Sequence, residues 1–238
     1  MDTYFSQVTF CPDSHSYRMN GQELTSVTKF LGQFKKPFDR MGIAQKVADR
    51  EGRSVSDVLA EWDTKSKNAL DLGTRVHEHI RKVLSGEKIE TDPFLSLNET
   101  CPEIEAFDKL YSNLTAKTTY VEWVIGDAEL GIAGTVDALF HRREIDEDHH
   151  IDEYHIFDWK TGKFDMFNNF ENLLPPFNEF DASQLNIYSL QLSLYRFIIE
   201  RNTPYKMGDS YIAHLASNGE YHLHKAVDMR DYFRDFFA

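Results

Sequence analysis

The stretch His155–Phe164, HIFDWKTGKF, places two opposite charges inside a hydrophobic strand. Side chains of a strand alternate between its faces with a period of two, so Asp158 and Lys160 point to one side. Phe157 and Trp159 point to the other side, into apolar packing, and the threonine and glycine that follow end the strand. Two interpretations are open. The charges form a partly buried ion pair, which is usually weak in net stability, or both serve a reacting group.

The composition is that of an ordinary globular protein. The chain has 238 residues, of which 41% are hydrophobic and 27% charged, enough for one sizeable domain. No apolar run approaches the roughly 18 residues that span a membrane, and the opening MDTYFSQVTF lacks the features of a secretory signal or a mitochondrial presequence. Cys11 and Cys101 are too few for a disulfide framework. We expect an intracellular, cytoplasmic protein without a membrane partner.

The charge is unevenly distributed along the chain. The net charge is −13, which by itself argues against a nucleic-acid partner. Residues 1–90 hold 14 Lys and Arg against 13 Asp and Glu, whereas residues 91–238 hold 12 against 26. The first part can therefore carry a basic patch, and the second a carboxylate-rich pocket held by metal cations. The net charge does not exclude DNA.

Hydrophobic periodicity predicts the first elements of the chain. Residues 4–24 show two alternating runs joined by turn residues, which indicates a small β-meander. A short helix is entered at Ser26 and stops before a proline. Helical patterning then dominates residues 39–85, with breaks near Gly52 and Thr64 and an N-cap at Ser54.

The rest of the chain alternates strands with helices. The predicted helices are residues 103–114, residues 184–201 and the C-terminal end, and the predicted strands are residues 118–125, 132–141, 155–161, 211–216 and 221–226. The acidic run REIDEDHHIDE, residues 143–153, is expected to be an exposed hairpin connection. We predict a mixed α/β fold with helices packed on a mixed sheet. It forms a single domain over residues 1–238, with a β/helical extension at 1–63 and a core at 64–238.

A second aspartate lies on the strand before Asp158. The segment GIAGTVDALF places Asp137 in an apolar strand, so two neighbouring strands each place an acid on one face. Like charges so close are costly unless a cation lies between them. Mg²⁺ and Mn²⁺ take oxygen ligands, and a lysine beside such an ion stabilises negative charge on a phosphate. The sequence therefore predicts a divalent-metal site that acts on phosphorus.

The order of these motifs resembles the PD-(D/E)XK nuclease superfamily, in which an aspartate strand precedes an Asp-X-Lys strand. Three segments are similar to its RecB-like exonuclease branch: GTRVHEHI, with a metal-binding histidine at His77; GIAGTVDALF, with a Gly-Thr-x-Asp strand; and YSLQLSLYRFIIE, with a Gln-x-x-x-Tyr helix. The opening HSYRMNGQELTSVTKFLGQFKKPFD resembles the leader of small phage-type and mitochondrial-maintenance-type members. One origin that this likeness implies for the chain is a virus, with the protein acting in the host cell.

The resemblance implies a restriction-endonuclease-like sheet and a role for each matched residue. Its metal ligands would be His77, Asp137, Asp158 and the backbone carbonyl of Trp159, with Glu122 ranked lower, on the strand before Asp137. Lys160 would be the catalytic lysine, with Gln191 and Tyr195 on one face of their helix to orient it or to hold the substrate backbone. Iron–sulfur members of the branch carry four cysteines, which this chain lacks, so no cluster is expected.

Several of these residues also have an ordinary structural interpretation. His77 on an amphipathic helix would by itself be a half-exposed polar residue. Tyr195 belongs to an apolar helical stripe with Tyr188, and a second Gln-x-x-x-Tyr pair, Gln184 with Tyr188, overlaps the preferred one. Basic residues near the N-terminus suggest phosphate contacts, with nearby phenylalanines for base stacking, although solvated lysines on a hydrophobic helix fit equally well. These residues are Lys29, Lys35, Lys36 and Arg40, with Phe30, Phe34 and Phe38.

The expected function is a DNA nuclease that depends on Mg²⁺ or Mn²⁺. An exonuclease acting on free ends or single-stranded DNA in replication, recombination or repair is preferred. A structure-selective endonuclease on the same fold and a catalytically silent nucleic-acid-binding module are the alternatives. The combination of one histidine, paired acids and a lysine disfavours the silent module, because paired buried acids carry a cost that only a function justifies.

Overall fold

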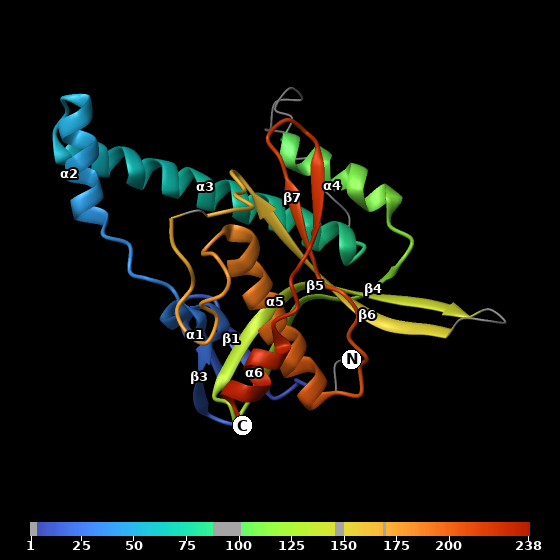
Figure 1. Cartoon of the computed structure of the whole chain (residues 1–238). Coiled ribbons are helices and arrows are strands. Elements are labelled where there is room, and N and C mark those ends of the chain that lie inside the picture. Colours follow the sequence, from blue (N-terminus) through green and yellow to red (C-terminus); the bar gives the residue numbers. More distant parts are fainter. Residues whose placement is uncertain (1–3, 88–100, 146–149, 169) are drawn as a thin grey trace.

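The computed structural model describes residues 4–87, 101–145, 150–168 and 170–238. Over these ranges the fold is mixed α/β, with an eight-stranded mixed sheet, six α-helices and one 3₁₀ helix, η1 (Gly32–Phe34) (Figure 1). The predicted fold class is confirmed at this level. None of the described helices is both long enough and apolar enough to cross a membrane.

Five strands form the body of the sheet. The long strand β5 pairs antiparallel with both β4 and β6, β7 runs parallel to β6, and β8 returns antiparallel to β7. A parallel neighbour of β6 requires a crossover connection, and the helix α5 lies in it. The bounds are β4 Lys117–Asp127, β5 Ile132–Ile145, β6 His150–Thr161, α5 Gln184–Asn202, β7 Tyr211–Leu215 and β8 Tyr221–Lys225.

The predicted N-terminal β-meander is present and joins the same sheet. Strands β1 (Val8–Cys11), β2 (Ser16–Met19) and β3 (Gln22–Ser26) pair antiparallel in order. The end of β3 then pairs in parallel with the start of β5, at Ile132 and Ala133. The first strands of the chain therefore lie beside the strand that carries Asp137.

Helices cover both faces of the sheet, as the alternation along β6 requires. Phe157 and Trp159 pack on one face with buried residues of α3 (Val55–Leu84) and α4 (Pro102–Asn113). Ile156 packs on the opposite face, in the core that α5 forms with two further helices. These helices are α1 (Val27–Leu31) and α6 (Arg230–Phe236).

The predicted break at Gly52 is confirmed, and the one at Thr64 is wrong. Gly52 ends α2 (Arg40–Glu51) with φ +63°, and the Ser54 hydroxyl caps α3 by accepting from the Asp57 backbone N–H. The helix then continues for 30 residues and crosses the expected boundary at residues 63 and 64. Thr64 causes no break because its hydroxyl donates to the Ala60 carbonyl within the helix. The first part of α3 and α2 extend away from the sheet (Figure 1).

More of the acidic segment 143–153 is paired as β-strand than the sequence predicted. Strands β5 and β6 pair as far as Ile145 and His150, so most of the segment belongs to the ladder. The pairing is supported across the strands because Asp152 lies 2.6 Å from His141 Nε2 and 3.9 Å from Arg143 Nε. The turn itself, residues 146–149, lies outside the described residues.

The glycine of β5 makes room for the tyrosine of α5. A Cβ atom on Gly134 would lie 2.6 Å from Tyr195 Cε1 and 3.1 Å from its hydroxyl oxygen. Tyr195 is 4% exposed, and its hydroxyl accepts a hydrogen bond from Gln191 Nε2 at 3.1 Å. The ring therefore has little freedom to move, and the close approach of α5 to the sheet depends on the missing side chain at Gly134.

We expect Gly134→Ala to lower the free energy of unfolding by about 1–3 kcal/mol, the usual cost of overpacking a core. The control is Gly32→Ala, because nothing lies within 4 Å of the added Cβ and φ is −56°. Urea unfolding followed by circular dichroism measures both variants. Equal stability of the two variants would contradict the close packing of α5 on β5.

Candidate metal centre

Three carboxylates form one row across β4, β5 and β6. The ladder places Glu122 opposite Asp137, with paired residues on either side. Asp158 faces Asp137 from the other strand, one position beyond the last β5–β6 pair, Ala138–Phe157. Like charges directly opposite one another destabilise a sheet. This row therefore needs a positive charge to offset its repulsion.

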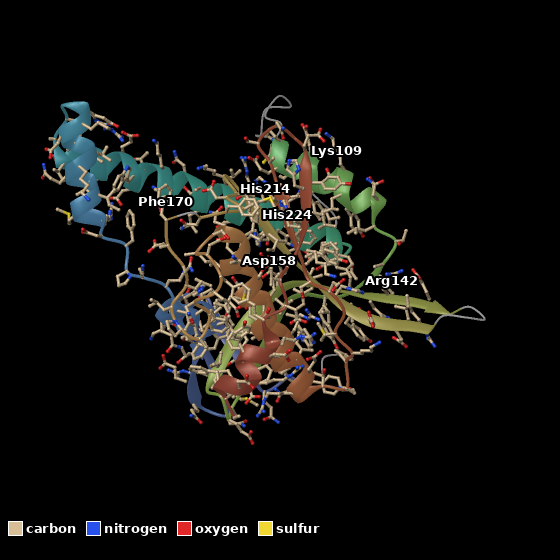
Figure 2. The ribbon with its side chains drawn as sticks, in the orientation of Figure 1. Lys109, Arg142, Asp158, Phe170, His214 and His224 are labelled. Atoms are coloured by element: carbon tan, nitrogen blue, oxygen red, sulfur yellow. The ribbon has the colours of Figure 1, made fainter. Side chains whose placement is uncertain are left out.

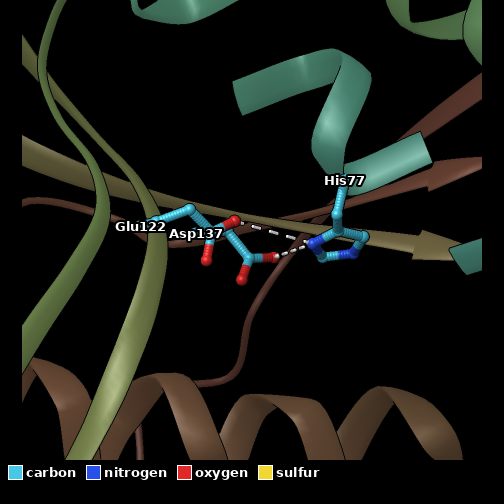
Figure 3. Close-up of side chains that lie close together, drawn as sticks. All are labelled: His77, Glu122 and Asp137. Atoms are coloured by element: carbon cyan, nitrogen blue, oxygen red, sulfur yellow. Dashed lines mark ion pairs between the residues drawn. The ribbon is translucent and has the colours of Figure 1, made fainter. Parts of the chain in front are cut away.

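His77 approaches the row from α3. Its Nδ1 atom lies 3.7 Å from Asp137 Oδ2 and 3.9 Å from Glu122 Oε1 (Figure 3). One ligand atom from each of these three residues lies within 4.8 Å of the others. Burial lowers the pKa of His77, but the neighbouring carboxylates of Asp137 and Glu122 raise it to about 9. The imidazole thus faces a strongly negative site, as a metal ligand would.

The backbone of Trp159 holds two of these residues in place. Its N–H donates to Asp137 Oδ2 at 3.0 Å, and its carbonyl accepts from His77 Nε2 at 3.1 Å. A metal-binding histidine usually donates its other ring N–H to a carbonyl or carboxylate, which fixes the ring. The Trp159 carbonyl, predicted as a ligand, has this orienting contact in the structure, and it leaves Nδ1 of His77 directed at the carboxylates.

Glu122, ranked lower from the sequence, is brought into the centre. It has φ +46° in the middle of β4, a conformation that a non-glycine residue adopts rarely and at a cost. Such strain persists only where the surrounding structure imposes it, and it clusters at functional sites. Counting the register back from Asp137 across the β4–β5 turn would have placed Glu122 opposite it.

Asp158 and Lys160 form a close pair beside this group. Lys160 Nζ lies 2.6 Å from Asp158 Oδ2, and the side chains are 21% and 3% exposed. Asp158 is not among the three residues whose ligand atoms cluster. Its Oδ2 is buried and has no aligned hydrogen-bond donor among the described residues, despite the short ion pair. Asp158, labelled near the middle of Figure 2, is 2% exposed over the whole residue, whereas Phe170 is 98% exposed.

The charges of this pair influence each other strongly. Burial raises the pKa of the Asp158 carboxyl, and nearby Asp137 raises it further against the opposing effect of Lys160. Burial lowers the pKa of Lys160, but the carboxylates of Asp158 and Asp137 raise it by more, above its ordinary value. The Asp158 carboxylate, which is buried beside Asp137, is therefore stabilised chiefly by the positive charge of Lys160.

The two candidate tyrosines of α5 lie in different places. Gln191 and Tyr195 bond to each other, as a pair at i and i+4 can. Tyr188 contacts the lysine, whose Nζ lies 4.7 Å from the ring centroid. Gln184, which precedes Tyr188 by four residues, instead accepts from the Asp165 backbone N–H. The sequence offers Gln184 with Tyr188 as the second, less favoured pair, and it does not predict the contact of Tyr188 with Lys160.

An open groove of about 970 Å³ runs past the centre. His77, Glu122 and Lys160 line it, together with residues of α3 and the N-terminal strands. Arg81 also borders the groove, although it is paired with Glu78 and Glu87. The groove is open to solvent and exposes the histidine, the glutamate and the lysine to a ligand.

The four residues of the predicted basic patch lie in different environments. Lys36 lies 3.8 Å from Glu171, and Arg40 lies 2.6 Å from Asp63, so both have acidic partners. Lys29 is exposed in the last turn of α1, and Lys35 borders a small hollow beside α5. Of the three phenylalanines, Phe34 is buried and Phe30 packs against the core, while Phe38 is exposed. Phe34 is therefore not available to stack on a base.

The donor set fits a hard divalent cation. Carboxylate oxygens are the ligands that Mg²⁺ and Mn²⁺ prefer, and one imidazole nitrogen is compatible with Mn²⁺. The opposed carboxylates of Glu122 and Asp137 are the feature that a cation would relieve.

No family model matches the chain, and no curated protein is significantly similar to it. The chemistry of the centre is therefore inferred from its own residues.

We expect Glu122→Gln to weaken Mn²⁺ binding at least about 10-fold, because changes even to groups behind the ligands cost 10–100-fold in metal affinity. Calorimetric titration of the metal-free protein with Mn²⁺ measures this. Glu179→Gln is the control, since Glu179 is exposed and lies outside the groove. Unchanged affinity in Glu122→Gln would remove Glu122 from the ligand set.

Proposed function

We propose that the protein is a nuclease that hydrolyses phosphodiester bonds in DNA and depends on Mg²⁺ or Mn²⁺. The observation that carries the proposal is the row of three carboxylates, Glu122, Asp137 and Asp158, with His77 at one side and Lys160 at the other. His77, Glu122 and Lys160 of this arrangement line an open groove of about 970 Å³. A purely structural role does not account for three acids in register.

His77, Glu122, Asp137 and Asp158 would hold the metal, which would act as a Lewis acid on the scissile phosphate. The Trp159 backbone orients His77 and Asp137, so the donors are fixed before the substrate arrives.

Lys160 supplies a fixed positive charge at the groove. A lysine is protonated at neutral pH, and this one is held between the Asp158 carboxylate and the face of Tyr188. A phosphate lying in the groove would meet its ammonium group, which stabilises negative charge as it develops on the phosphoryl oxygens. Gln191 and Tyr195 support the site from behind, because their bonded pair packs under Gly134, three residues before Asp137.

Within this class we propose an exonuclease of the PD-(D/E)XK superfamily, with a restriction-endonuclease-like core, acting on free ends or single strands. The support is the order of the elements: a histidine helix, an aspartate strand, an Asp-X-Lys strand and a Gln-x-x-x-Tyr helix leading to a parallel strand. Of the residues of these motifs, His77 and Lys160 line one groove, and Asp137 lies within ligand distance of His77.

The proposal is tested with end-labelled linear DNA and closed circles, each single- and double-stranded, incubated with Mg²⁺ or Mn²⁺. We expect degradation of a linear substrate, none in EDTA, and resistance of the circles. Cleavage that persists in EDTA would overturn the metal centre. Circles cut as fast as linear strands would make the protein an endonuclease, and intact DNA under all conditions would contradict the nuclease assignment.

A further inference from the structure

A second, smaller hollow adjoins the groove on the side of the N-terminal strands. It measures about 310 Å³, against about 970 Å³ for the groove. Phe10, His15 and Glu122 line both, so the two spaces meet at the carboxylate row. A ligand that extends past Glu122 from the groove therefore reaches this hollow next.

The walls of the hollow combine aromatic rings with hydroxyl groups. Phe10 packs edge-on against His15, with ring centroids 5.1 Å apart. Ser26 and Thr28 place their hydroxyl oxygens 3.3 Å apart at its border, and Thr28 is exposed. Aromatic faces stack on bases of any identity, while hydroxyls donate to and accept from sugars and base edges.

The charge of the hollow distinguishes it from the groove. Lys160 and Arg81 border the groove, whereas the described residues that line the hollow include neither lysine nor arginine. Its one carboxylate is Glu122, which repels a phosphate. The hollow is thus suited to an uncharged group, because no described lysine or arginine lines it to pair with a second phosphate.

The backbone is strained at the junction of the two spaces. His15 has φ +47° and Glu122 has φ +46°, and they are two of the three non-glycine residues with positive φ in the described part of the chain. Both face the hollow and the groove. Strain of this kind gathers at ligand sites, where the fold imposes it.

We propose that the hollow binds the terminal nucleoside of a DNA strand whose scissile phosphate lies at the carboxylate row. This assignment rests on the proposed nuclease function and adds its substrate register. The volume is at the lower end for a ligand pocket, about 300–1,000 Å³, and so admits one nucleoside and no longer segment. The strand lies in the groove, its last nucleoside occupies the hollow, and each cut releases one nucleotide.

The test uses full-length Lys160→Ala protein with Mn²⁺, in which strands bind while cleavage is about 10²–10³-fold slower than with Lys160. Single-stranded oligonucleotides carry the fluorescent base 2-aminopurine at the 5′ end, at the 3′ end or in the middle, and fluorescence anisotropy of a separate label reports binding. Stacking quenches 2-aminopurine. We expect quenching at one end only, and a circular strand of the same length should bind about 5- to 100-fold more weakly, the loss expected for one base–aromatic contact.

Two further variants, each made in the Lys160→Ala protein, test the location. Thr28→Trp fills the hollow from an exposed position and should abolish the end-specific quenching. Thr9→Trp is the matched control, since Thr9 is exposed and lies outside the lining, and it should leave the quenching intact. Product size from the enzyme with Lys160 gives a separate readout, for which we expect mononucleotides.

The outcomes separate the two proposals. Binding with equal quenching at all positions, or end quenching that survives Thr28→Trp, would overturn the hollow as the nucleoside site and leave the nuclease intact. Products of two or more nucleotides would also overturn it. No anisotropy change with any strand would overturn the proposed function and the hollow assignment together.

Discussion

The backbone N–H and carbonyl of Trp159 make the two contacts on which the site depends. Its N–H holds Asp137, its carbonyl holds His77, and its indole is 1% exposed in the core beneath α3 and α4. The same strand places Asp158 and Lys160 on the opposite face. Because one β-strand alternates its faces, the packing of a single tryptophan fixes both the core and the reactive groups.

This arrangement has a cost in stability. Three carboxylates share one row of the sheet, Glu122 adopts a left-handed backbone conformation, and Asp158 is a buried carboxylate. Each feature would be easily relieved by substitution, for instance by an uncharged residue at any position of the row. Proteins break local rules of this kind at functional sites and compensate elsewhere. The compensation here is His77, Lys160 and, in our account, a divalent cation.

Much of this site follows from short-range patterns in the sequence. Alternation in β6 predicts that Asp158 and Lys160 share a face, and the apolar strand before it predicts Asp137 beside them. The caps at Ser26 and Ser54 predict where α1 and α3 begin, because side-chain oxygens there satisfy free backbone N–H groups.

The rest depends on contacts between distant segments. Glu122 enters the centre through the β4–β5 register, which can be counted across the turn, and through a positive φ, which its neighbours in the sequence do not reveal. Tyr188 and Tyr195 are seven residues apart and so lie on one helical face. Tyr188 meets the ammonium group at the end of the long Lys160 side chain, and Tyr195 enters the core where Gly134 has no side chain. Neither contact follows from the helical pattern. Thr64 continues its helix because its hydroxyl finds a partner four residues earlier.

The central claim is that Lys160 lies beside Asp158 to act on a substrate. Lys160→Ala, measured with Mn²⁺ for both melting temperature and DNA turnover, tests it most directly. Lys163→Ala is the control, since that side chain is 85% exposed. Our account predicts a nearly unchanged melting temperature and a fall in turnover of about 10²–10³-fold. A loss of about 3–5 kcal/mol in stability, typical of a broken buried ion pair, with normal turnover in the folded fraction would contradict it.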